Sequence, residues 1–334
     1  MSVYDHRTSR AKRLAISRRA FSSGRSFPQH HPYVQEGRLH CGQNVYPSEL
    51  RDQDRFKTTV TQYHQAMTAL AEDITRLHCI SGDDVSCGGL KISGYYTPGT
   101  FQQYVLSKAN YVTPIPEDLA SEIAAPLLCG GVTVYSALKK SGAQPGDFVV
   151  IPGCSGGLGH LGLQLGSRVF GYRMIGIDSG DKKAIAEECG CEFFFDLGAY
   201  SRDEEGTEKL IEDIKKTSDG QGATAVVLCT GSKAAYDMSI RLLRTKGTVV
   251  CVGVPNGDVT PIAGADPGTL VAKQLKIVGS AVGNRLEAIE TLNYAARRLI
   301  KTKITVENLQ SLNEVFRKIK DGRLQGRAVI SLTD

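Results

Sequence analysis

The sequence predicts an α/β protein whose larger part is a doubly wound parallel sheet. Strand-like and helix-like patterns alternate from residue 147 to residue 278, and the strand-like runs are continuously apolar, as in strands that are buried on both faces of a parallel sheet. A glycine-rich turn follows the first of these runs and leads into a helix. Because 334 residues exceed what one hydrophobic core usually serves, we expect a second lobe as well.

The alternating region divides into two halves. The first half has a βαβαβ pattern, with strands expected at 148–151, 174–177 and 193–195 and helices at 158–170 and 182–188. The second half has expected helices at 208–217 and 233–243 and strands at 225–229, 248–252 and 276–278. Outside this region the pattern predicts one strand at 100–105 and one helix near 58–77.

Composition and charge exclude several classes of protein. With 41% hydrophobic residues and no apolar run that approaches the roughly 18 residues of a membrane span, no membrane partner is expected. Nine scattered cysteines in a chain of this size indicate reduced thiols or metal ligands and a cytoplasmic location. The net charge of +5 comes from residues 1–35, and without a basic stripe elsewhere we expect no nucleic-acid partner.

The glycine-rich turn predicts a dinucleotide site. It comprises Gly153 to Gly159, with glycine also at 156 and 157, and such glycines let the backbone approach a pyrophosphate at the N-terminus of the following helix. Asp178 ends the next predicted strand, 19 residues after Gly159, close to the spacing at which an acid accepts hydrogen bonds from an adenosine ribose. Its carboxylate would repel a 2′-phosphate, so we expect NAD rather than NADP.

Several further blocks of sequence identify a family. The chain from Cys79 to Asp334 resembles the fungal zinc-containing alcohol dehydrogenases of the medium-chain superfamily. The matching blocks, in order and in addition to the glycine turn and Asp178, are Ser93–Tyr95, Gly99–Tyr104, Pro126–Tyr135, Val252–Pro255, Val278–Arg285 and Gly326–Arg327. This resemblance implies a Rossmann sheet beside a GroES-like catalytic domain, which is incomplete here.

The resemblance implies a role for each matching cofactor residue. The pyrophosphate would lie against the glycine turn, the adenosine ribose against Asp178 and Lys183, and a cofactor phosphate against Arg327. For Lys183 the alternative is a solvated lysine at a helix start. The residues implied at the nicotinamide end are Val252, Val254, Ser280 and Val282. The full set implied to bind NAD is Gly156, Gly157, Leu158, Gly159, Asp178, Lys183, Val252, Val254, Ser280, Val282 and Arg327.

The resemblance also implies zinc. Cys129 matches one cysteine of the catalytic zinc, a Lewis acid that family members hold with two cysteines and a histidine. Cys79 and Cys87 match the last two of four cysteines around a structural zinc, whose first two places hold Asp73 and Arg76 here. Two thiolates do not complete a tetrahedral site, so the second zinc is in doubt.

The segment before Cys79 departs from the family. Its expected Cys-His pair and Gly-His-Glu segment are missing, and His40-Cys41 has the order reversed. Either the N-terminus is altered, or residues 1–35, which are rich in Arg and Ser, are a leader for the mitochondrial matrix. We therefore expect three parts: an atypical segment at 1–78, a catalytic remnant at 79–126 and 285–334, and an NAD-binding domain at 127–284.

The expected activity is reversible hydride transfer between a primary or secondary alcohol and NAD, with a small alcohol, aldehyde or ketone as substrate. Two alternatives remain: a catalytically silent dinucleotide-binding protein, and a zinc-free quinone or enoyl reductase of the same superfamily. The missing ligands predict weak zinc binding and slow alcohol oxidation by this chain. As the resemblance implies, the strand at 276–278 would pair subunits in a homo-oligomer.

Overall fold

The computed structural model describes residues 77–94, 96–102, 105, 107, 111–257 and 259–332. They fall into two units, one formed by the described residues up to Pro114 together with Leu332, and one by 115–331. The helix expected near 58–77 lies almost entirely outside the described residues. The boundaries that the sequence predicts at 127 and 284 stay a prediction.

The first unit contains two short helical turns, α2 (Leu77–Ile80) and η3 (Asp84–Ser86). Cys87 and Tyr111 are buried side by side, and Cys79 packs against them. The strand predicted at 100–105 is wrong for its described residues, 100–102 and 105, none of which lies in a strand. There the side-chain amide of Gln102 donates to the carbonyl of Gly99, so this carbonyl is used locally rather than in a sheet.

The second unit is built on a six-stranded parallel sheet, and the doubly wound fold that the sequence predicts is confirmed. The strand order is β3-β2-β1-β4-β5-β6, so the chain reverses its direction of winding between β1 and β4. The strands are β1 (Phe148–Pro152), β2 (Arg173–Asp178), β3 (Phe193–Asp196), β4 (Ala223–Leu228), β5 (Leu243–Cys251) and β6 (Lys276–Gly279).

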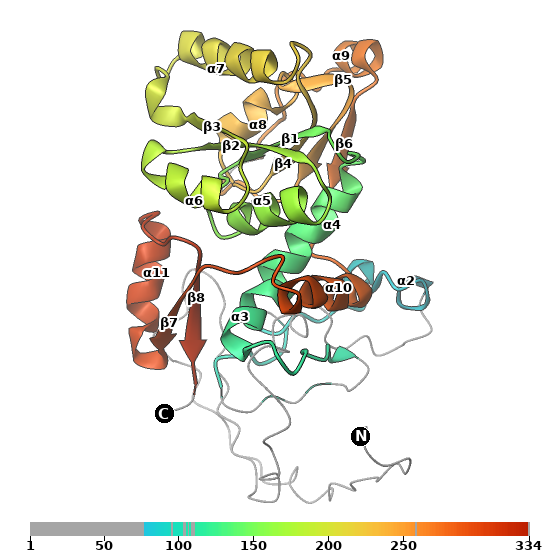
Figure 1. The fold of residues 1–334 in the computed structure, drawn as a ribbon. Coiled ribbons are helices and arrows are strands. Elements are labelled where there is room, and N and C mark those ends of the chain that lie inside the picture. Colours follow the sequence, from blue (N-terminus) through green and yellow to red (C-terminus); the bar gives the residue numbers. More distant parts are fainter. Residues whose placement is uncertain are drawn as a thin grey trace, which may run out of the picture. The chain divides into compact units, whose positions relative to one another are not determined.

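Helices cover both faces of the sheet (Figure 1). One face carries α5 (Gly159–Arg168) and α6 (Lys183–Glu188), and the other carries α7 (Glu204–Thr217) and α8 (Lys233–Ser239), with α9 (Pro267–Lys273) leading into β6. Val150, Ile175 and Val226 of the central strands are fully buried against the second pair of helices. Burial on both faces explains why these strands are continuously apolar in sequence.

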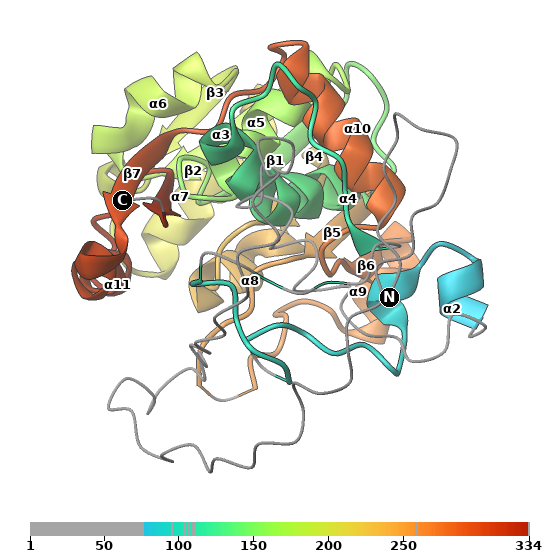
Figure 2. The same cartoon turned by 90° about the horizontal axis from the view of Figure 1, so that it is seen from below.

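A long helical run precedes the sheet. It consists of α3 (Ser121–Pro126), a π-helical turn at Leu127–Gly131 and α4 (Val132–Lys140). The helix α10 (Arg285–Ala296) lies alongside α4 (Figure 2). The 20 residues Ser121–Lys140 are long and apolar enough for a membrane span by composition, but 67% of their most apolar window is buried inside the protein.

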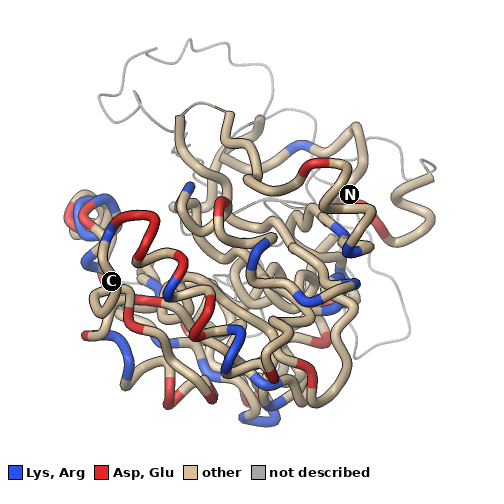
Figure 3. Tube along the Cα trace, turned by 90° about the horizontal axis from the view of Figure 1, so that it is seen from above, with Lys and Arg blue, Asp and Glu red and all other residues tan. Residues whose placement is uncertain are grey.

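The C-terminal part of the second unit adds a small parallel sheet. It pairs β7 (Ile304–Asn308) with β8 (Arg327–Ser331), and the turn η8 (Leu309–Ser311) and the helix α11 (Leu312–Lys320) connect them. Basic and acidic residues are interspersed along the described chain (Figure 3), and some form local ion pairs such as Lys303 Nζ with Glu188 Oε2 at 2.8 Å.

Candidate cofactor site

The glycine turn connects the end of β1 to the start of α5. Gly153 has a φ of +71°, in the left-handed region that favours glycine. A Cβ at Gly159 would collide with the carbonyl oxygen of Gly153, so the first turn of α5 can reach the end of β1 only because residue 159 has no side chain. The turn therefore brings the N-terminus of α5 to the carboxyl edge of the sheet, where an anion is favoured.

Asp178 stands beside this turn at the end of β2. Its side chain is buried, with the residue 8% exposed. Oδ2 accepts a hydrogen bond from the backbone N–H of Ser155 at 3.0 Å, and Oδ1 accepts one from the N–H of Ser179 at 2.9 Å. The acid that the sequence predicts beside the adenosine ribose is thus fixed against the predicted pyrophosphate turn.

The structure brings Lys182, and not Lys183, to Asp178. Lys182 Nζ lies 3.2 Å from Asp178 Oδ1, whereas the exposed Lys183 begins α6 and pairs with Glu187 at 3.7 Å. Spacing alone does not signal this pair, because residues four apart face each other within a helix, whereas Asp178 ends a strand and Lys182 ends a 3₁₀ turn. The contact of Lys183 with the ribose stays a prediction.

Arg327, at the start of β8, lies over the glycine turn. A Cβ on Gly157 would come within 3.0 Å of its Cδ, and a Cβ on Gly130 within 3.4 Å of its guanidinium. The same guanidinium donates to the Sγ of Cys129 at 3.1 Å. The structure thus brings together the implied phosphate ligand, the implied pyrophosphate turn and the implied metal ligand.

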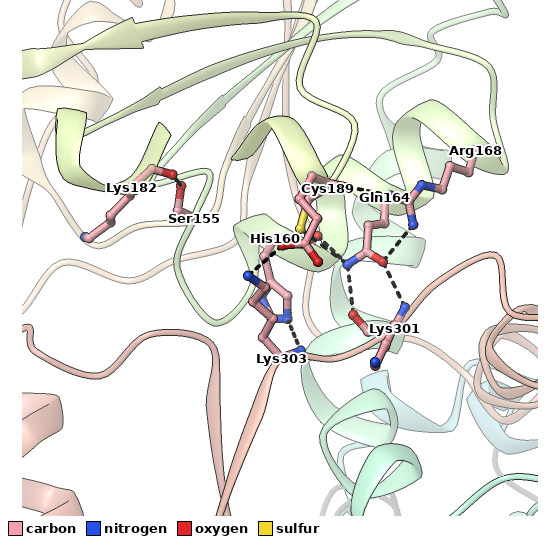
Figure 4. A network of polar contacts seen from close by, with 9 residues as sticks. Ser155, His160, Gln164, Arg168, Lys182, Cys189, Lys301 and Lys303 are labelled. Carbon is pink, nitrogen blue, oxygen red and sulfur yellow. Dashed lines mark hydrogen bonds and ion pairs between the residues drawn. The ribbon is translucent and has the colours of Figure 1, made fainter. Parts of the chain in front are cut away.

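A buried histidine of α5 that no sequence motif marks contacts both the glycine turn and Lys303, and its contact with Lys303 is drawn in Figure 4. His160 is fully buried, its Nδ1 lies 2.8 Å from the carbonyl of Gly156, and its Nε2 accepts from the N–H of Lys303 at 3.2 Å. The carbonyl of Lys303 in turn accepts from the N–H of Arg327. Burial, and then the charges of Arg327 and Lys303, lower the pKa of His160 to about 4, so the ring is neutral and Nδ1 donates.

Gln164, one helical turn further along α5, extends the same network. Its amide oxygen accepts from the N–H of Lys301 at 2.8 Å, and its amide nitrogen donates to the carbonyl of Lys301 at 3.0 Å. The residue is only 3% exposed, and both polar atoms of its side chain are hydrogen-bonded within the protein. Two polar side chains of α5 therefore hold the segment that leads into β7, Lys301 and Lys303, and through it Arg327.

The residues implied at the nicotinamide end follow β5 and β6. Val252 comes directly after β5, Val254 is 83% exposed, and Ser280 is buried and accepts from Lys140 Nζ at 3.2 Å. Val282 has a φ of +49°, which is rare for a β-branched residue and costs about 1–3 kcal/mol of strain. Such strain is typical of functional sites.

The described residues do not form a catalytic zinc site by themselves. Cys129 lies on the π-helical turn, half-buried, and its thiol faces Arg327, which cannot ligate a metal. Nowhere in the described ranges do three His, Cys, Asp or Glu side chains come together as a metal site would require. His40 and Cys41 lie outside those ranges.

Cys79 and Cys87 lie together in the first unit. Partial burial, and then the neighbouring Cys87 thiol, raise the pKa of Cys79. This geometry agrees with two adjacent members of the implied cysteine set, while Asp73 and Arg76 lie outside the described residues. The structural zinc stays a prediction.

Comparison with known proteins shows the lineage. Residues 157–299 match the family described as zinc-binding dehydrogenases. The chain is 48% identical to alcohol dehydrogenase 2 of Emericella nidulans over 256 residues. This match covers 76% of this chain and 70% of the relative. It is 37% identical over 257 residues to the alcohol dehydrogenase of Schizosaccharomyces pombe, with 77% and 70% covered.

Solved structures of alcohol dehydrogenases also resemble this fold. The alcohol dehydrogenase of Aeropyrum pernix matches with a TM-score of 0.68 at 27% identity, over 77% of this chain and 72% of that one. The N-terminal segment of about 76 residues, which departs from the family pattern, is not matched by the curated relatives. The resemblance seen in the sequence is confirmed, and the chain belongs to the zinc-type alcohol dehydrogenases of the medium-chain dehydrogenase/reductase superfamily.

Proposed function

We propose that this chain is an NAD-dependent alcohol dehydrogenase that transfers a hydride between a primary or secondary alcohol and NAD. One observation carries the cofactor part of the proposal: the buried carboxylate of Asp178 accepts from Ser155 within the glycine turn, at 3.0 Å. Acid and turn therefore form one surface at the carboxyl ends of β1 and β2, next to the point where the strand order reverses.

The residues around the turn fit a dinucleotide. A Cβ on Gly157 would press on both Arg327 and the carbonyl of Gly326, at 3.0 and 3.1 Å, so the cradle is kept open by glycine. The pyrophosphate would be held by the turn and Arg327, the adenosine ribose by Asp178, and the nicotinamide by the segments after β5 and β6. When bound, NAD supplies the ring carbon that accepts the hydride.

Zinc dependence is a separate part of the proposal. A catalytic zinc in such enzymes takes three protein ligands, and of these only Cys129 lies among the described residues. The thiol of Cys129 is hydrogen-bonded to a guanidinium, which a metal ion would have to displace. NAD binding and zinc content are therefore expected to vary independently, and both must be measured.

Calorimetry and absorbance test the proposal. The purified chain is titrated with NAD and with NADH, and NADH formation is then followed with a panel of primary and secondary alcohols. Binding of both nucleotides, with alcohol-dependent NADH formation, is the expected result. A chain that binds neither nucleotide would contradict the proposal at its first step.

We further propose a cytoplasmic homo-oligomer. The strand β6 is last in the sheet order and three of its four residues are exposed, so it offers an edge for a second copy. Light scattering on the purified chain measures the mass, and a fluorescent fusion shows the location in the cell.

A further inference from the structure

We propose that Lys182 is a specificity-determining residue, which competes with the adenosine ribose for Asp178 and offers its ammonium group to a 2′-phosphate. The chain would then bind NADP more tightly than it would if Asp178 were the only charged group at this position. This inference rests on the proposed function, because it concerns the same nucleotide site.

The carboxylate of Asp178 is nearly saturated with donors. Oδ1 accepts from the N–H of Ser179 and from Lys182 Nζ, and Oδ2 accepts from the N–H of Ser155. A carboxylate has about four acceptor sites, so three are taken and one is left. A ribose diol that donates two hydrogen bonds needs one more site. Of the three donors, only the ammonium of Lys182 can leave without a change in the backbone.

The backbone of Lys182 is fixed while its side chain is not. Ser155 Oγ donates to the carbonyl of Lys182 at 3.2 Å, a contact drawn in Figure 4, and the N–H of Lys182 donates to the carbonyl of Ser179 at 3.0 Å. The Lys182 side chain is 26% exposed, against 10% for that of Asp178. Rotation of the lysine side chain can therefore move the ammonium toward solvent while its attachment point stays beside the site.

The surrounding charges make this lysine important for a phosphate. Asp196 is the register neighbour of Asp178 on β3, and its carboxylate lies against Gly180, so two acids stand at this edge. The ammonium of Lys183 is already paired with Glu187. A 2′-phosphate at this edge would be repelled by both carboxylates, and the ammonium of Lys182 is the nearby charge that offsets the repulsion.

The test compares dissociation constants for NAD and NADP by calorimetry, at one pH and one ionic strength. In Lys182→Met we expect the ratio of the NADP constant to the NAD constant to rise about two- to fivefold, the range expected for one partly exposed ion pair. Binding of NAD itself should be unchanged or tighter, because Asp178 gains a free acceptor site. Lys182→Arg keeps the charge and should keep the wild-type ratio within about twofold.

A matched control separates this effect from loss of one positive charge. Lys216 on α7 is an exposed lysine that pairs with Asp213 at 3.3 Å, and Lys216→Met should leave the ratio unchanged. A ratio that stays the same or falls in Lys182→Met, while NAD still binds, would overturn the inference and leave the proposed function intact. If the wild-type chain binds neither nucleotide, both fail together.

Discussion

The carboxylate of Asp178 makes the sharpest prediction at the scale of single residues. Asp178→Ala removes the acceptor for the ribose and also leaves the N–H of Ser155 without its partner. We expect NAD binding to weaken by about 1–3 kcal/mol and the preference over NADP to narrow. Asp181→Ala, which removes an exposed acid three residues further on, is the matched control. Calorimetric titration measures both, and equal effects would remove the special role of Asp178.

His160 predicts how stability depends on pH. Its pKa is about 4 in the folded chain and near the usual 6.5 when unfolded, so the unfolded state binds more protons between these values. The free energy of unfolding should therefore fall by about 2 kcal/mol between pH 7 and pH 5 from this residue alone. In His160→Gln, which keeps a donor and an acceptor, the fall should be smaller by that amount. Urea unfolding at both pH values measures it, and identical pH slopes would contradict the buried neutral ring.

These two residues show what sequence can reveal about a site. Asp178 is predicted correctly beside the turn because its place depends on a fixed spacing along one βαβ unit. His160 and Lys182 are missed because their importance depends on contacts: His160 meets Lys303, 143 residues away, and Lys182 meets Asp178 only through the conformation of the intervening turn.

At the scale of elements, the glycine turn predicts that Gly159 cannot be replaced. In Gly159→Ala the new Cβ would collide with backbone atoms of Gly153 and Cys154, so the start of α5 must move. We expect a loss of stability of about 1–3 kcal/mol and at least about tenfold weaker NAD binding. Gly279→Ala, on β6, meets open space and is the control. Thermal unfolding measures the stability of both variants, and calorimetry measures their NAD affinity. Equal losses in Gly159→Ala and Gly279→Ala would contradict the requirement for glycine at 159.

Most element types are predictable here, and the exceptions have local causes. The helix expected at 233–243 ends at Ser239, because Leu243 already begins β5. There it pairs with Ala223 of β4, and both residues are buried. The apolar residues in that stretch are buried in the core whether the backbone is extended or helical, so their pattern does not mark where the helix ends. The π-helical turn around Cys129 has no periodic signal, since it inserts into a helix whose pattern continues on both sides.

At the scale of the whole molecule, the residues expected to bind the cofactor and those expected to bind the metal differ in how complete they are. The cofactor set lies within residues 115–331 and its parts contact one another through Asp178, His160 and Arg327. The metal set contributes Cys129 alone among the described residues, and the family's other ligands are missing from the sequence before Cys79. A single thiol gives little of the chelate stabilisation that holds a catalytic zinc.

This difference predicts the result of a chimera. The purified chain should contain well under one zinc per molecule and oxidise ethanol slowly, while it binds NAD. Replacing residues 1–78 with the corresponding N-terminal part of alcohol dehydrogenase 2 of Emericella nidulans should raise both zinc content and turnover and leave NAD affinity within about twofold. Cys129→Ser in the chimera should lower zinc and turnover again. Metal analysis, NADH formation and calorimetry on the three proteins test these expectations. One full zinc per molecule and fast turnover in the unaltered chain would contradict them, and would mean that residues before Cys79 complete the zinc site.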